Sequence, residues 1–189
     1  MIVGFDHFDL LAKVYDRLIP PPDPADLIRL LQLPIEGRLL DVGGGTGRVA
    51  ATLRTRAGSI VVSDLSTKML HQARRKEGLQ AVRAHAERLP FPDKSFDRVL
   101  VVDALHHFCD QRDAIQDLVR ILAPGGRLVI EEPDYTRFAV KLVAVAEKLA
   151  FMRSRFHTPE VIAEMARGYA RATTIERDNR FRAWILIDG

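Results

Sequence analysis

Four glycines stand within five positions after an apolar run, in the stretch "LLDVGGGTGRVA": Gly43, Gly44, Gly45 and Gly47. Glycine loses more conformational freedom on folding than any other residue. A cluster therefore indicates a tight turn, a left-handed backbone, or something that comes close to the backbone. The candidates are a dinucleotide, a nucleotide phosphate, another small ligand, or a turn with a structural role only. Because a structural turn usually needs only one or two glycines, we favour a ligand.

The spacing of these glycines disfavours the two commonest phosphate loops. A P-loop needs a lysine and a hydroxyl residue after its last glycine, whereas Gly47 is followed by Arg48 and a valine. A G-x-G-x-x-G dinucleotide fingerprint that begins at Gly43 would put its third glycine where Arg48 stands. The spacing present is Asp41-x-Gly43-x-Gly45-x-Gly47. A carboxylate beside the loop repels a pyrophosphate and suits a ligand with a cationic amino or sulfonium group.

Around this loop, short apolar runs of strand length alternate with helical patterns. The runs cover residues 38–42, 59–64, 80–84, 97–103 and 127–132. Near-continuous apolar runs are typical of strands that are buried on both faces of a parallel sheet. The last residues predict a hairpin around Asp178 and Asn179. The order of elements therefore predicts an α/β fold: a three-layer, doubly wound, mostly parallel seven-stranded sheet with an antiparallel C-terminal strand.

Capping residues mark where the helices between the strands begin. Ser66, Asp110 and Thr158 stand at N-cap positions, and "APGG" at 123–126 is expected to end the helix that Asp110 starts. Apolar spacing predicts further helices over residues 5–19, after the proline-rich residues 20–24, and over 138–152.

These motifs together resemble a known family. The D-x-G-x-G-x-G spacing resembles motif I of the class I S-adenosylmethionine-dependent methyltransferases. "AHAERLPFPDKSFDRVLVVDALHHF" (84–108) is similar to a stretch of the small-molecule type 11 methyltransferases, typified by the ubiquinone/menaquinone-biosynthesis enzymes. "RILAPGGRLVIEEPD" (120–134) resembles that group's turn into strand five, and "FDLLAKVYDRL" (8–18) resembles its N-terminal helix. The resemblance implies the Rossmann-like methyltransferase fold.

The resemblance also implies S-adenosylmethionine as cofactor, S-adenosylhomocysteine as product, and a set of residues that hold the cofactor. Asp64 stands where the family has an acid that binds the ribose hydroxyls, and a carboxylate can accept both hydrogen bonds. His85 departs from the family, which often has an aspartate there that contacts the adenine amino group. The implied cofactor residues are Tyr15, Asp41, Gly43, Gly44, Gly45, Gly47, Asp64, Leu65, Met69, His85, Ala86, Glu87 and Asp103.

Methyl transfer requires alignment of donor and acceptor, and it requires a general base only when the acceptor must lose a proton. The catalytic candidates are Asp103, His106 and His107, just after the fourth strand, with Tyr15 from the N-terminal helix. Structural roles for the two histidines, and core packing for Tyr15, stay open as alternatives. Because no further His or Cys stands nearby at ligand spacing, we expect no metal site. The Pro-Pro-aromatic sequence of methyltransferases that act on adenine or glutamine does not follow Asp103.

Composition narrows the class of protein. The chain has 189 residues, a net charge of +3 and one cysteine, Cys109, so we expect one domain without an intramolecular disulfide. The N-terminus lacks the pattern of a signal peptide, and no apolar run approaches the roughly 20 residues that span a bilayer. These features predict a cytoplasmic protein. Residues 137–189 hold 10 Lys and Arg against 6 Asp and Glu, but the charges are spread out, which disfavours nucleic acid as a partner.

We therefore expect a single domain over residues 1–189, with a helical cap over the cofactor site at 1–34 and a core at 35–189. Its expected function is transfer of a methyl group from S-adenosylmethionine to a small apolar or aromatic acceptor. Two alternatives stay open: a cofactor-binding but catalytically idle partner subunit, and a nicotinamide-dependent oxidoreductase, which the glycine spacing disfavours. The acceptor, the atom that is methylated, and the choice between monomer and homodimer are left open.

Overall fold

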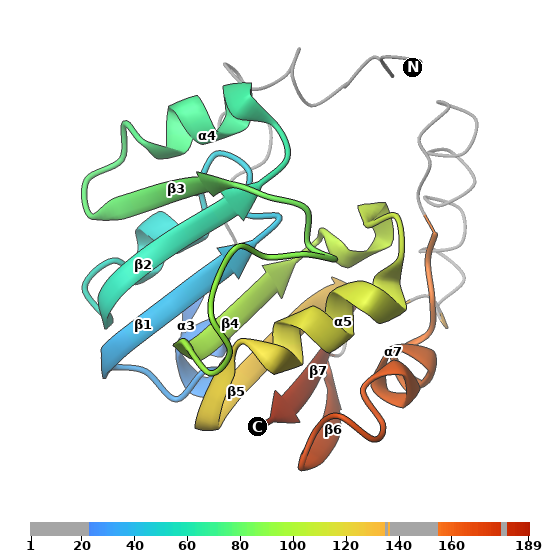
Figure 1. Cartoon of the computed structure of the whole chain (residues 1–189). Helices are drawn as coiled ribbons and strands as arrows, with labels where there is room; N and C mark the ends of the chain where they lie inside the picture. The colour runs from blue at the N-terminus through green and yellow to red at the C-terminus, as the bar shows by residue number, and fades with distance from the viewer. Residues whose placement is uncertain (1–22, 135, 137–154, 179–180) are drawn as a thin grey trace, which may run out of the picture.

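The computed structural model describes residues 23–134, 136, 155–178 and 181–189. Their strands form one seven-stranded sheet in the order β3-β2-β1-β4-β5-β7-β6 (Figure 1). The strands are β1 (Ile35–Val42), β2 (Ala57–Asp64), β3 (Leu79–Arg83), β4 (Phe96–Val102), β5 (Leu122–Pro133), β6 (Ala172–Arg177) and β7 (Arg182–Asp188). Neighbouring strands are parallel, except that β7 runs antiparallel to both β5 and β6. The predicted fold class and the C-terminal hairpin are confirmed.

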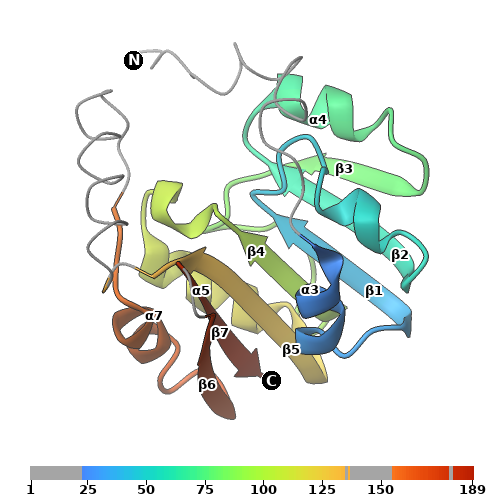
Figure 2. The same cartoon turned by 180° about the vertical axis from the view of Figure 1, so that it is seen from behind.

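Helices cover both faces of the sheet. The back face carries α3 (Pro24–Leu30), the 3₁₀ turn η1 (Ala50–Leu53) and α4 (Thr67–Ala73); η1 packs against α3 and β2, and α4 packs against β2 and β3 (Figure 2). The front face carries α5 (Gln111–Arg120) and α7 (Pro159–Met165) over β4, β5 and β7 (Figure 1). A second 3₁₀ turn, η2 (Leu105–His107), follows β4. The helices predicted over 5–19 and 138–152 lie outside the described residues, as does Tyr15.

Two of the predicted N-caps make the hydrogen bonds that define them. The Ser66 hydroxyl accepts from the Met69 N–H at 3.1 Å. The Asp110 carboxylate accepts from the N–H groups of Arg112 and Asp113 at 3.0 and 3.1 Å. These bonds satisfy N–H groups that have no partner within their own helix, so α4 and α5 begin where the sequence predicted.

The segment after α5 differs from the prediction. The helix ends at Arg120, and "APGG" (123–126) lies inside β5 instead of in a turn. Sheet pairing accounts for the difference: Leu122 pairs with Phe96 of β4, and the Gly189 N–H donates to Gly126 O at 3.1 Å. Partners distant in sequence thus extend the strand beyond the predicted 127–132.

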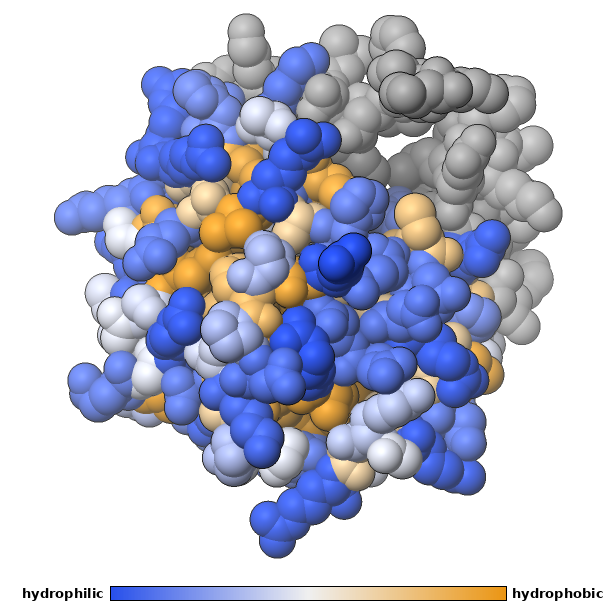
Figure 3. All heavy atoms as spheres, in the orientation of Figure 1, coloured by the Kyte–Doolittle hydropathy of each residue, from blue (hydrophilic) through white to orange (hydrophobic). Residues whose placement is uncertain are grey.

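Between the glycine loop and β2 the structure has only the four-residue turn η1. On the front face, no described helix covers β1 to β3 (Figure 1). Figure 3 shows apolar side chains gathered between α4 and α5 on this face, and Val82, Ala84 and Phe91 of the front core are only partly buried. The carboxyl ends of β1, β2 and β4 meet at one edge, where ligands bind in open α/β sheets (Figure 1).

Candidate functional site

The glycine loop follows β1 at this edge and is fastened to β2. The N–H groups of Gly43 and Gly44 donate to Ser63 O at 2.8 and 3.2 Å, and the Gly47 N–H donates to Gly44 O at 2.8 Å. Gly43, Gly45 and Gly47 have positive φ angles of 71°, 56° and 71°. Residues with a side chain rarely adopt this conformation, so three of the four glycines are explained by backbone geometry.

The space around the glycines differs, and only Gly45 could take a Cβ without a clash. A Cβ on Gly43 would lie 2.6 Å from Ala104 Cβ, one on Gly44 would lie 2.6 Å from Asp41 Oδ2, and one on Gly47 would lie 2.8 Å from Leu79 Cδ1. A Cβ on Gly45 would have nothing closer than Asp64 Oδ2 at 3.9 Å. A Cβ on Gly45 would be in ordinary van der Waals contact with Asp64 Oδ2 and Met69 Sδ, so Gly45 is the one glycine of the four at which an added methyl group meets no clash.

Asp64, at the end of β2, lies beside Gly45. Its Oδ2 accepts from the Gly45 N–H at 2.9 Å and its Oδ1 accepts from the Ser66 N–H at 2.7 Å. An ionised carboxylate offers about four lone-pair sites, so it can accept backbone donors and ribose hydroxyls together. The position fits the role that the resemblance implies, since one carboxylate joins the glycine loop to the start of α4.

Asp41 lies beneath the loop instead of on its surface. Its side chain is 1% exposed, and burial raises its pKa to about 7, with Asp64 adding to the rise and Arg48 opposing it. Burial disfavours the charged form of a carboxyl group, whereas a nearby guanidinium favours it. Asp41 therefore acts on any ligand through the loop's backbone and its charge.

The other predicted cofactor residues, Leu65, Met69 and the segment 85–87, differ in exposure. Leu65 is 42% exposed, whereas Met69 is 2% and Ala86 is 7% exposed. The His85 side chain is exposed, and its Nδ1 lies 3.8 Å from Glu87 Oε2. Glu87 Oε1 accepts from the N–H groups of Cys109 and Asp110 at 2.8 and 3.2 Å, so Glu87 connects this turn to the start of α5.

The three catalytic candidates lie together after β4 but in different environments. Asp103 is half-exposed, with a positive φ of 50°, and its N–H donates to Glu131 O at 3.0 Å. His106 is 5% exposed, and its Nδ1 lies 2.6 Å from Glu132 Oε2. Burial and the nearby His106 lower the pKa of His107 to about 3, so His107 is neutral at physiological pH.

Two consecutive glutamates at the end of β5 support this region from opposite sides. Glu132 Oε1 accepts from the N–H groups of Ala104 and Leu105 at 3.1 and 2.8 Å, in addition to its contact with His106. Glu131 Oε2 accepts from the Trp184 indole N–H at 2.6 Å, and Arg182 Nη1 lies 3.0 Å from Glu131 Oε1. Both carboxylates are buried.

Sequence reasoning missed these two glutamates and the role of Arg48. Arg48 is 9% exposed, and its Nη2 lies 3.8 Å from Asp103 Oδ2. A signal for the glutamates was present: two acidic residues end an apolar strand at the edge where ligands bind. For Arg48 the signal was its position, directly after the last glycine of the loop.

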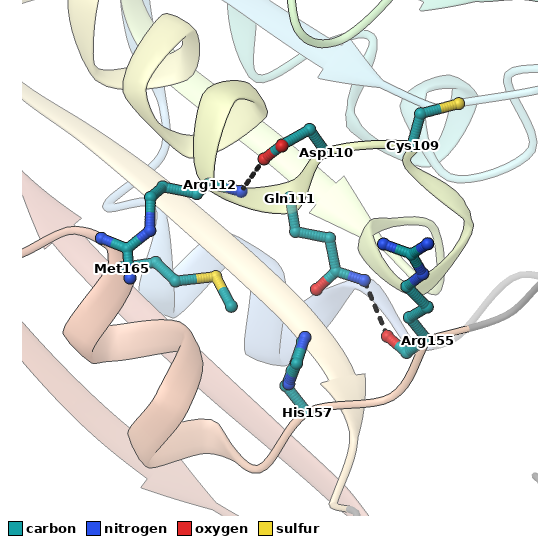
Figure 4. Close-up of a pocket in the computed structure, with 7 residues that line it drawn as sticks. All are labelled: Cys109, Asp110, Gln111, Arg112, Arg155, His157 and Met165. Carbon is teal, nitrogen blue, oxygen red and sulfur yellow. Dashed lines mark hydrogen bonds between the residues drawn. The ribbon is translucent and has the colours of Figure 1, made fainter.

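A separate pocket of about 140 Å³ lies between the start of α5 and the segment that leads to α7 (Figure 4). Its lining residues are Cys109, Asp110, Gln111, Arg112, Arg155, His157 and Met165. None of them is a predicted cofactor or catalytic residue. Gln111 closes one side by donating from Nε2 to Arg155 O at 2.7 Å. The Arg155 N–H in turn donates to His106 O at 2.8 Å, which connects the pocket wall to the catalytic candidates.

Among the described residues, no cluster of His, Cys, Asp and Glu side chains is arranged to hold a metal ion. No helix in the same part of the chain is long and apolar enough to cross a bilayer.

Known proteins resemble this chain in sequence and in fold. Residues 40–130 match a family model described as "Methyltransferase domain". A demethylmenaquinone methyltransferase of Thermus thermophilus is 43% identical over 102 residues, which is 50% of this chain and 46% of the relative. The ubiquinone/menaquinone biosynthesis C-methyltransferase UbiE of Pseudomonas fluorescens is 38% identical over 105 residues, 50% of this chain and 41% of the relative. The matched stretches span less than half the length of these relatives.

A solved structure from Thermotoga maritima, described as a SAM-dependent methyltransferase and possible histamine N-methyltransferase, has the same fold. Its TM-score is 0.76 at 23% identity, and the match covers 96% of this chain and 97% of that one.

The fold is that of the class I S-adenosylmethionine-dependent methyltransferases, and over residues 40–130 the chain is similar in sequence to methyltransferase domains. The relatives that match this stretch are methyltransferases of quinone biosynthesis, the group that the sequence was predicted to resemble.

Proposed function

We propose that this chain binds S-adenosylmethionine at the loop 43–47 and transfers its methyl group to a small apolar or aromatic acceptor. The observation that carries the proposal is the pairing of the left-handed Gly45 with Asp64, whose Oδ2 accepts from the Gly45 N–H at 2.9 Å at the edge of the sheet where ligands bind. Asp64 would hold the ribose hydroxyls, and the exposed Leu65 beside it offers an apolar surface to the adenine ring. Asp103, and Asp41 when it is ionised, contribute negative charge near a cationic ligand.

When bound, S-adenosylmethionine supplies the electrophile, a methyl group on a sulfonium that leaves as a neutral thioether. The protein has to align the acceptor and, for a carbon or oxygen acid, to accept its proton. His106 suits that second task better than His107. The Glu132 carboxylate fixes the His106 tautomer with the proton on Nδ1, so Nε2 is the nitrogen that accepts a proton. The low pKa of His107 makes it a weak base near pH 7.

Relatives that are named for methylation in quinone biosynthesis suggest which acceptor to test first. A naphthoquinol ring is apolar and aromatic. Its hydroxyl loses a proton as a ring carbon accepts the methyl group, and the same carbon then loses its hydrogen while the hydroxyl is reprotonated, so one proton is released overall. A cytoplasmic location and a cap role for residues 1–34 are part of the same proposal.

The test incubates the purified chain with S-adenosylmethionine and a panel of naphthoquinols, phenols and amines, and follows product mass. We expect a gain of one methyl group on at least one aromatic hydroxyl compound. His106→Asn should lower kcat by a factor of about 10² to 10⁴ while S-adenosylhomocysteine still binds. His71→Asn, on the exposed side of α4, is the matched control and should retain wild-type kcat.

If S-adenosylhomocysteine binds but no acceptor is methylated, the idle-subunit alternative is favoured. If His106→Asn retains the wild-type kcat, the proposed base is wrong.

A further inference from the structure

Arg48 is a buried arginine among acidic groups. Arginine is almost never fully buried unless it is paired, and this side chain is 9% exposed. Its Nη2 lies 3.8 Å from Asp103 Oδ2, and its charge also lowers the pKa values of Asp41 and Glu131. One guanidinium therefore acts on three carboxyl groups.

These three carboxyl groups come from adjacent strands. Asp41 belongs to β1, Asp103 follows β4 and Glu131 belongs to β5, and the three strands are neighbours in the sheet. Burial raises the pKa of each of them. Glu132 further raises the pKa of Asp103, while Arg182 and His106 act with Arg48 in lowering it. Asp64 further raises the pKa of Asp41.

Of the three, Asp103 is the group that a ligand can reach. Its side chain is 44% exposed, whereas Asp41 is 1% and Glu131 is 1% exposed. The residue after it, Ala104, abuts the glycine loop, because a Cβ on Gly43 would lie 2.6 Å from Ala104 Cβ. Asp103 thus stands at the rim of the loop, and Arg48 lies behind it.

We infer that Arg48 is a positioning residue that keeps Asp103 ionised and directed to the loop, so that Asp103 can bind the ammonium group of the cofactor's methionine end. The inference rests on the proposed function, since it assigns a partner to the donor site. Without the guanidinium, Asp103 and Glu131 would keep Arg182 as the cation that acts on both among the described residues, with the addition of His106 for Asp103 when that histidine is protonated. Like charges held close together favour protonation of one of them.

The test compares wild type with Arg48→Met by calorimetric titration of S-adenosylhomocysteine at pH 6 and pH 8, a range in which the ligand's ammonium group stays mostly protonated. We expect Arg48→Met to weaken binding about tenfold at pH 6 and by less than about threefold at pH 8, because higher pH favours the ionised form of Asp103. Arg48→Lys, which retains the charge, should bind within about threefold of wild type at both pH values. Arg56→Met is the control, because Arg56 is exposed.

A loss that is equal at both pH values means that Arg48 has only a structural role, and no loss means that it has no role in binding. Either result overturns the inference. A double-mutant cycle adds a second criterion: in an Asp103→Asn background, Arg48→Met should cost less than about twofold. A full tenfold loss in that background also overturns it.

A third readout does not depend on the cofactor. Carbon-13 NMR titration of the Asp103 carboxyl group in the ligand-free protein should show a higher pKa in Arg48→Met than in wild type, and an unchanged pKa contradicts the inference. If wild type itself fails to bind S-adenosylhomocysteine, the proposed function and the assigned ligand are wrong, while this titration still decides whether Arg48 controls Asp103.

Discussion

At the scale of single residues, the type and spacing of side chains at the loop predicted most of what the structure shows. Positive φ at three glycines and the contact of Asp64 with the Gly45 N–H follow the pattern expected of a ligand loop. The depth of Asp41 could not be predicted, because burial depends on how η1 and the loop pack over β1. Asp41, which the sequence predicted to bind the cofactor, therefore lies beneath the loop.

The burial of Asp41 has a consequence for stability. Because its folded pKa of about 7 is above the unfolded value of 3.8, the folded state holds a proton that the unfolded state releases between these pH values. The protonated Asp41 carboxyl group therefore contributes fully to the free energy of unfolding below pH 3.8. This contribution declines as the pH rises from 3.8 to about 7 and is lost above that.

From pH 5 to pH 8, Asp41 should reduce the free energy of unfolding of wild type by roughly 2–3 kcal/mol. Asp41→Asn has no carboxyl group that titrates at this position, so its free energy of unfolding should fall less over the same interval. Urea unfolding of both proteins at the two pH values measures the difference. Equal pH dependence in both would show that Asp41 is not the group that titrates.

At the scale of elements, the strands were predicted well and the connections less well. Apolar runs and capping residues located β1 to β4 and the starts of α4 and α5, because these depend on nearby sequence. The start of β5 at Leu122 depends on Phe96 and Gly189, which are distant in the chain. The role of Glu132 could not be predicted for the same reason, because its partners, the N–H groups of Ala104 and Leu105, are distant in the chain.

The loop between β1 and η1 allows a paired test. Gly45→Ala should fold, since the added Cβ has no contact closer than 3.9 Å and a left-handed alanine costs about 1–2 kcal/mol. It should nevertheless lose most affinity for S-adenosylhomocysteine, because the methyl group occupies the space beside Asp64. Gly43→Ala should instead lose more stability, since its Cβ would clash with Ala104.

Urea unfolding and calorimetric titration of the two variants separate these effects. Wild-type affinity in Gly45→Ala would mean that no ligand approaches the loop at this position.

At the scale of the whole molecule, alternation of strands and helices predicted the layered sheet, and the C-terminal hairpin predicted the antiparallel strand. The fold alone does not determine the chemistry, since related sheets carry many activities. Glycine spacing and the order of motifs led to the family, which the match over residues 40–130 supports. The acceptor could not be predicted, because acceptor contacts depend on side chains that the cofactor motifs do not include.

The central claim is that this loop binds S-adenosylmethionine and not a dinucleotide. Thermal unfolding with S-adenosylhomocysteine, and separately with NAD, tests it most directly. At 100 times its dissociation constant, S-adenosylhomocysteine should stabilise wild type by about 2.7 kcal/mol, and NAD should have no effect. Asp64→Asn should lose most of this stabilisation, whereas Asp113→Asn, an exposed control on α5, should keep it. Stabilisation by NAD alone, or an unchanged response in Asp64→Asn, would contradict the account.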